Sequence, residues 1–131
     1  MPKRRIRILM MALAGVGGCA AAGSLLQQAP ATAIGKTNPY EGDDRAARAG
    51  RKLYERECAS CHGRAGEGVA KKPPLASRAV AEASAGSMEW VLRNGSITRG
   101  MPSFSHLPIQ QRWQIITYLK ALSVQAMVHQ P

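Results

Sequence analysis

Two cysteines and a histidine occur in the order Cys58-Ala59-Ser60-Cys61-His62, which is a C-x-x-C-H spacing. Two thiols three positions apart can each add to a vinyl group on one edge of a porphyrin, and the next residue then presents its imidazole to the iron. A thioredoxin-like redox pair has no use for the adjacent histidine, and a zinc site needs a second pair of ligands that the chain lacks. The spacing therefore predicts one covalently bound haem c, attached through Cys58 and Cys61, with His62 as an iron ligand.

The composition leaves room for such a group. The 131 residues allow one domain, and only one Phe, two Trp and three Tyr are present to fill its core. Small cores are marginal unless a cofactor or crosslink is built into them. Three cysteines are too few for a disulfide framework, and the odd number leaves Cys19 with a separate role.

A six-coordinate iron needs a second ligand. The candidates are the methionines and histidines that follow the attachment site: Met88, Met101, Met127, His106 and His129. Met88 lies in an expected helix, where a core role is adequate, and Met127 and His129 lie in an expected tail. Met101 lies between Gly100, which allows close backbone approach, and Pro102, which fixes the chain. We expect Met101 to be the sixth ligand, with His106 as a bis-histidine alternative.

The apolar spacing predicts an all-α fold with three main helices, long loops around one haem and no strands. The first helix follows Asp43 and Asp44, whose carboxylates supply an N-cap and favourable charge at the positive end of the helix dipole. Its apolar face is thin at Gly50, where close approach of another helix is expected.

The other two helices lie on either side of the Met101 loop. One is expected over 87–94, with Ser87 as its N-cap and Gly95 as the left-handed residue at its end. The last is expected over 108–122, with a proline in its first turn and a wide apolar stripe that predicts near-complete burial.

The N-terminal residues 1–18 have the organisation of an export signal. A basic segment precedes an apolar run over 8–16 and a group of small residues. Val16-Gly17-Gly18-Cys19 resembles the lipobox of bacterial lipoproteins, in which cleavage leaves the cysteine as a lipidated N-terminus. We therefore expect an exported, periplasmic protein that is anchored to a membrane as a lipoprotein.

Two alternatives to this processing stay open. Cleavage at Ala20-Ala21-Ala22 or Ala31-Thr32-Ala33 would discard Cys19, and the uncharged stretch over 8–26 is just long enough to be an uncleaved anchor. Residues 19–39 are expected to be a flexible tether, since they have no apolar period from Leu25 onward. The folded domain is then expected over 40–126, with a short tail over 127–131.

Residues 40–122 resemble a small class I monohaem cytochrome c of the bacterial periplasmic kind. The resemblance rests on these segments: Gly50 and Tyr54, Cys58 to His62, Pro73-Pro74-Leu75, Arg93-Asn94-Gly95 before Met101-Pro102, Trp113 and Tyr118-Leu119. It implies that the first and last helices cross at Gly50 against Tyr118. It also implies that the carbonyl of Pro73 accepts the proton on the other ring nitrogen of His62. Pro74, in the middle of the P-x-L segment, leaves the choice between the two proline carbonyls open.

Ligation of both iron faces favours an electron carrier between periplasmic or membrane-bound redox enzymes, rather than an enzyme. The alternatives are a haem enzyme or sensor with a displaceable sixth ligand, and a haem-containing small subunit of a periplasmic dehydrogenase or oxidase. Neither nucleic acid nor a small-molecule substrate is expected. Arg64, Lys71, Lys72 and Arg99 flank the site in sequence. They are either scattered solubilising charges or a positive collar that steers an acidic redox partner.

Overall fold

A computed structural model describes residues 25–130, so the expected export signal, the Cys19 lipobox and the first part of the tether lie outside the described residues. The helices are α2 (Ala31–Ile34), α3 (Asp44–Glu57), α4 (Ala59–His62), α5 (Arg78–Glu82), α6 (Ala85–Asn94), the 3-10 turn η1 (Ile97–Arg99) and α7 (Ile109–Val128). The described region contains two isolated β-bridges and no strand, which confirms the all-α prediction. No helix within it has the length and apolar character that a membrane span requires.

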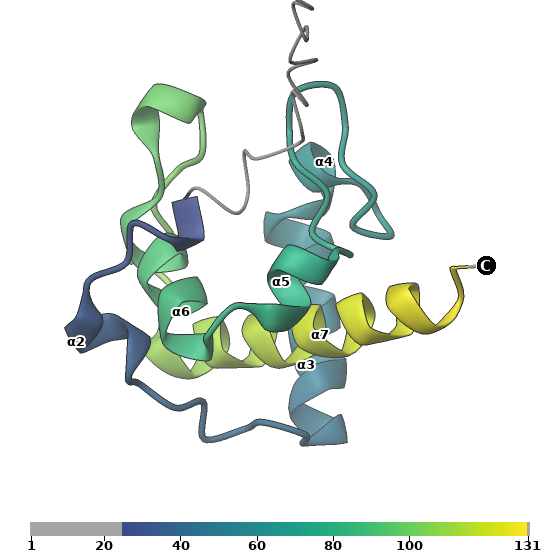
Figure 1. Ribbon diagram of the computed structural model, residues 1–131, viewed down its shortest axis with the longest axis horizontal. Helices are drawn as coiled ribbons and strands as arrows, with labels where there is room; N and C mark the ends of the chain where they lie inside the picture. Colours follow the sequence, from purple (N-terminus) through teal and green to yellow (C-terminus); the bar gives the residue numbers. More distant parts are fainter. Residues whose placement is uncertain (1–24, 131) are drawn as a thin grey trace, which may run out of the picture.

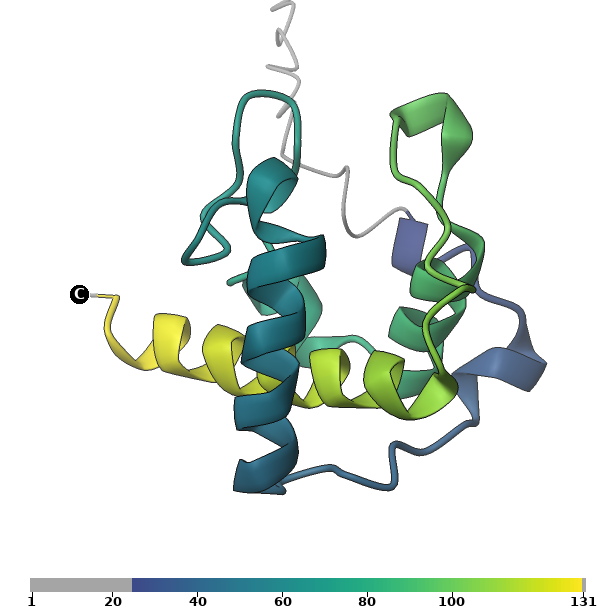
Figure 2. The same ribbon diagram turned by 180° about the vertical axis from the view of Figure 1, so that it is seen from behind.

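Helices α3 and α7 cross and form the frame of the molecule (Figures 1 and 2). A Cβ atom added to Gly50 would lie 1.9 Å from the Gln114 carbonyl oxygen and 3.0 Å from Tyr118 Cβ. The rings of Tyr54 and Tyr118 meet beside this point, with their centroids 5.4 Å apart. The close helix approach predicted at Gly50 is confirmed, and it requires the missing side chain.

The start of α3 also agrees with its sequence. Asp43 is the N-cap, and its carboxylate accepts hydrogen bonds from the amides of Arg45 and Ala46 at 2.7 and 2.9 Å. These two bonds lower the pKa of Asp43. Helix α6 instead begins a turn earlier than expected, because Ser84 Oγ accepts the Ser87 amide at 3.0 Å and Ser87 is buried inside the helix. Both serines suit an N-cap, and the helix uses Ser84 instead of the expected Ser87.

Helix α7 continues past its expected end at residue 122 and includes Met127, so the tail expected over 127–131 is wrong for its first two residues. Neither Gly nor Pro occurs between Leu122 and Val128, and nothing there stops the helix. The extension is useful because Ser123, which is fully buried, donates a hydrogen bond to the Leu75 carbonyl at 2.7 Å.

The short helix α5 was not expected from the sequence. Ser77 caps its start by accepting the Val80 amide at 3.3 Å. Lys120 of α7 donates to the carbonyls of Ala81, at 2.8 Å, and Ala83 at its other end. Burial lowers the pKa of Lys120. A cation from α7 thus satisfies the carbonyls that end α5.

The tether expected over 19–39 is wrong for the part that the structure describes. Helix α2 packs against α6, so closely that a Cβ atom on Gly86 would lie 1.8 Å from the Ala33 carbonyl oxygen. Asn38 is buried and donates to the Trp113 carbonyl at 3.2 Å and to Thr117 Oγ1 at 2.9 Å. We call residues 25–38 the N-terminal strap. The folded domain therefore begins with this strap rather than at residue 40.

Candidate haem-binding site

The C-x-x-C-H segment forms a single helical turn, α4, directly after α3. The amides of Cys61 and His62 both donate to the Cys58 carbonyl, at 3.1 and 3.0 Å. Cys58 is buried and Cys61 exposed, and neither is in a disulfide. Burial raises the pKa of the Cys58 thiol to about 12. The turn places both thiols and the imidazole on the wall of one cavity.

One ring nitrogen of His62 makes a hydrogen bond to the backbone. Its Nδ1 lies 2.9 Å from the Pro73 carbonyl oxygen. A carbonyl can only accept, so Nδ1 carries the proton and donates, which leaves the lone pair of Nε2 for a metal. Of the two proline carbonyls that the sequence left open, that of Pro73 makes the contact.

The backbone on both sides of this contact is fixed. Tyr54, whose side chain is completely buried, donates its hydroxyl to the Gly63 carbonyl at 2.6 Å, directly after His62. Ser123 holds Leu75, two residues after Pro73. Sequence reasoning missed both roles. Each had a signal, because a buried tyrosine hydroxyl or serine within an apolar helix face needs a hydrogen-bond partner.

Met101 lines the same cavity and is held by a tight turn. Its amide donates to the Ser96 carbonyl at 2.9 Å, and the Ser96 amide donates to the Met101 carbonyl at 2.8 Å. This pair closes the segment that contains η1, and Gly100 completes it with a left-handed φ of 73°. The Phe104 amide then donates to the Leu92 carbonyl at 2.8 Å, which ties the loop to α6.

The cavity between these elements has a volume of about 530 Å³. His62 and Met101 both line it. Most of its other deep lining is apolar, contributed by Leu75, Val80, Met88, Val91, Leu92, Phe104 and Leu119. This volume lies within the range of cofactor pockets, about 300–1,000 Å³. The donor set fits a haem: two thiols for attachment, an imidazole and a thioether for the iron, and apolar walls for the macrocycle.

The other ligand candidates differ in position. Met88 lines the cavity and is 5% exposed, so it is a second thioether within the same space. His106 is exposed with its ring centroid 6.0 Å from that of Phe104, and His129 is exposed at the end of α7. Neither histidine is among the residues that line the cavity, and Met127 is not among them either. No group of three His, Cys, Asp or Glu side chains in the described region could hold a metal ion by itself.

Residues 45–119 match the family model described as cytochrome C oxidase, cbb3-type, subunit III. The chain belongs to this family of cytochrome c domains. Its fold is similar to the crystal structure of cytochrome CL from the marine methylotrophic bacterium Methylophaga aminisulfidivorans MPT. The two share 19% sequence identity with a TM-score of 0.58, over 97% of this chain and 89% of that chain. A search of curated proteins gave no match.

Membership of the family confirms two predictions made from the sequence. The chain carries covalently bound haem c, and it functions in haem-based electron transfer. Domains of this family are typically exported, and they exchange electrons with redox partner proteins. When bound, the haem supplies an iron that gains or loses one electron. The residues that line the cavity would position the haem and exclude water from it.

The loop that follows α4 and the segment that contains η1 project from the same end of the molecule (Figures 1 and 2). Lys71, Lys72 and Arg99 line the cavity there, and Lys72 Nζ donates to the Arg99 carbonyl across the mouth at 3.4 Å. Arg64 lies elsewhere, beside Glu55 and Ser60. The structure therefore brings three of the four expected collar residues together, and these three are the basic collar below.

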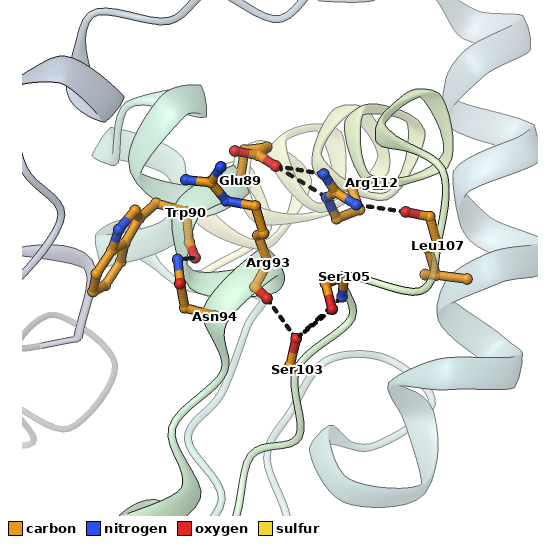
Figure 3. A network of polar contacts seen from close by, with 8 residues as sticks. All are labelled: Glu89, Trp90, Arg93, Asn94, Ser103, Ser105, Leu107 and Arg112. Carbon is orange, nitrogen blue, oxygen red and sulfur yellow. Dashed lines mark hydrogen bonds and ion pairs between the residues drawn. The ribbon is translucent and has the colours of Figure 1, made fainter.

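A buried ion pair fixes the far end of the Met101 loop (Figure 3). Arg112 of α7 lies 2.9 Å from Glu89 of α6, and it also donates to the carbonyl of Leu107, where the loop ends. Their side chains are only 8% and 1% exposed. The other Glu89 oxygen, Oε2, is buried without a hydrogen-bond partner in the described region.

Replacing Glu89 with alanine is expected to lower the free energy of unfolding of the haem-loaded protein by about 3–5 kcal/mol, because Arg112 would be left as an unpaired buried charge. Chemical denaturation measures this. Glu82→Ala is the matched control, since it breaks an exposed 3.3 Å pair with Arg78, which is worth at most about 1 kcal/mol. Equal losses in the two variants would contradict a structural role for the buried pair.

Proposed function

We propose that this cytochrome is an electron carrier whose haem iron is held by His62 and Met101, with no open coordination position. The observation that carries the proposal is that both side chains line one cavity together with the two cysteines of the attachment motif. A methionine ligand raises the reduction potential, and a closed iron favours outer-sphere electron transfer over substrate chemistry. The test is the visible and near-infrared spectrum of the protein after c-type maturation. A methionine-ligated ferric haem gives a weak near-infrared band, and absence of this band in the wild type would overturn the assignment.

The proposal extends to how the carrier is anchored. Cleavage after Ala33 of Ala31-Thr32-Ala33 would remove three of the four residues of α2 and the leucines at 25 and 26, which line the cavity. The packing of the strap thus argues against this downstream site, and among the upstream alternatives the lipobox-like sequence before Cys19 leads us to propose Cys19 as the lipidated residue. Six residues lead from Cys19 to Leu25, and even when fully extended they span only about 20 Å. A lipid on Cys19 would hold the cavity close to the membrane surface.

Lipidation of Cys19 has a direct test. The variant Cys19→Ala should move from the membrane fraction to the periplasmic fraction while its haem spectrum stays unchanged. Mature wild-type protein that begins after Ala22 without lipid mass would contradict the anchor.

We further propose that the cavity mouth is the docking surface for a redox partner with acidic groups. The basic collar borders the mouth, and Ile97, in the turn beside it, is 92% exposed. Val69, whose carbonyl accepts the Lys72 amide, is 48% exposed. Glu57 also lines the cavity, but it is paired with Arg56 at 2.6 Å. Exposed apolar side chains beside a basic collar suit a weak complex that forms fast.

Reversing one collar charge is expected to slow electron transfer. Lys71→Glu should reduce the rate at which membranes of the source bacterium oxidise the reduced protein, by about tenfold at low ionic strength, and the difference should fade as salt is added. The control is Lys52→Glu, an equal change of charge on the exposed face of α3. Identical rates for the two variants would show that only net charge matters.

A subunit role is the second candidate function, and the family description, which is that of an oxidase subunit, favours it. In that case the chain would stay bound to an oxidase when membranes are dissolved in mild detergent. Migration with oxidase activity on a native gel would support this role, and migration as a small separate haem protein would support the mobile carrier.

A further inference from the structure

The N-terminal strap contributes to the haem cavity, although it lies outside the part of the chain that matches the family. The match begins at residue 45. Leu25 and Leu26 nevertheless line the cavity, together with Met101. Both leucines are half-buried. An apolar wall is thus supplied by a segment that the family model does not cover.

The strap is fixed to α6 and α7, which both contribute side chains to the cavity lining. On α6, the Gly86 backbone touches the Ala33 carbonyl on one side, while Met88 and Leu92 line the cavity. On α7, Asn38 is bonded to Trp113 and Thr117. These contacts hold the strap at its middle and at its end, and Leu26, near its start, packs against the hydrophobic core.

We propose that the N-terminal strap is a wall of the haem crevice, in which Leu25 and Leu26 contact the haem and keep water from it. The oxidised iron centre carries one more positive charge than the reduced one, so exclusion of water disfavours the oxidised state and raises the reduction potential. The inference requires that haem occupies this cavity, but it does not depend on which residue is the sixth ligand.

The test uses the full haem-loaded chain and compares midpoint potentials measured by spectroelectrochemistry. The double variant Leu25→Ser, Leu26→Ser should have a lower potential than the wild type while the near-infrared band is retained. Gln27→Ser, an exposed change in the same segment, is the control and should leave the potential unchanged. If the double variant has the same midpoint potential as the Gln27→Ser control, the proposal is overturned.

A second variant keeps the test decisive if the double variant does not mature. Gly86→Ala leaves every cavity-lining side chain intact but places a Cβ atom against the Ala33 carbonyl, so α2 must move away from α6. The potential should again fall, with the ligand band retained. An unchanged potential would overturn the proposal. A wild-type spectrum without the near-infrared band, by contrast, would contradict Met101 as the sixth ligand, but it would not contradict the proposal that the strap is a wall of the haem crevice.

Discussion

A chain in which Cys58 and Cys61 are both replaced by serine is expected to lack haem and to be unfolded after export. The reason is the size of the space that haem fills. At about 24 cal/mol per Å³, an empty cavity of 530 Å³ would cost up to about 13 kcal/mol. That is as much as the entire stability of an ordinary domain, about 5–15 kcal/mol. The few aromatic side chains of the core cannot refill the space.

The measurement is far-ultraviolet circular dichroism together with acid–acetone extraction. In the wild type, haem should stay with the precipitated protein, and helical signal should persist. In the double variant, both the protein-bound haem and the helical circular dichroism signal should be lost. Cys19→Ser is the matched control, because it removes the third cysteine without touching the attachment motif. Helical signal in the double variant equal to that of the wild type would show that the fold does not need its cofactor.

The sequence was most informative where one residue type has a single physical use. The fixed spacing of Cys58, Cys61 and His62 led to the haem, and Gly50 led to the helix crossing, because only a missing side chain allows a carbonyl at 1.9 Å from the Cβ position. Both predictions needed no knowledge of distant contacts. The N-cap at Asp43 is of the same kind, since a carboxylate before a helix bonds only to its own first turn.

The strap escaped prediction because its contacts are made by small or polar residues and by backbone. The carbonyl of Ala33 packs against Gly86, which has no side chain. Asn38 donates hydrogen bonds to the Trp113 carbonyl and the Thr117 hydroxyl, which lie 75 and 79 residues further along the chain. Hydrophobic periodicity does not register such contacts. The same holds for Ser123, whose polarity within an apolar helix was a signal that could be interpreted only once its partner, Leu75, was known.

Replacing Met101 with alanine is expected to open the iron while leaving the fold intact. The two hydrogen bonds that close its turn join main-chain atoms of Ser96 and Met101, so they survive the loss of the side chain. The end of the loop stays bound to Arg112 through the Leu107 carbonyl. The thioether alone is removed, and with it the sulfur that raises the potential.

The Met101→Ala protein should lose the near-infrared band and have a lower midpoint potential. External imidazole should bind its ferric haem at least about tenfold more tightly than in the wild type, a difference of about 1.4 kcal/mol. Met88→Leu is the matched control, because Met88 lines the same cavity and should leave the spectrum unchanged. A spectrum that changes in Met88→Leu and not in Met101→Ala would move the ligand to α6. If neither substitution alters the band, both Met88 and Met101 are excluded, and the band would have to come from another methionine such as Met127. A bis-histidine iron with the exposed His106 as its ligand would instead lack the band in the wild-type protein, so the wild-type spectrum separates this alternative from any methionine.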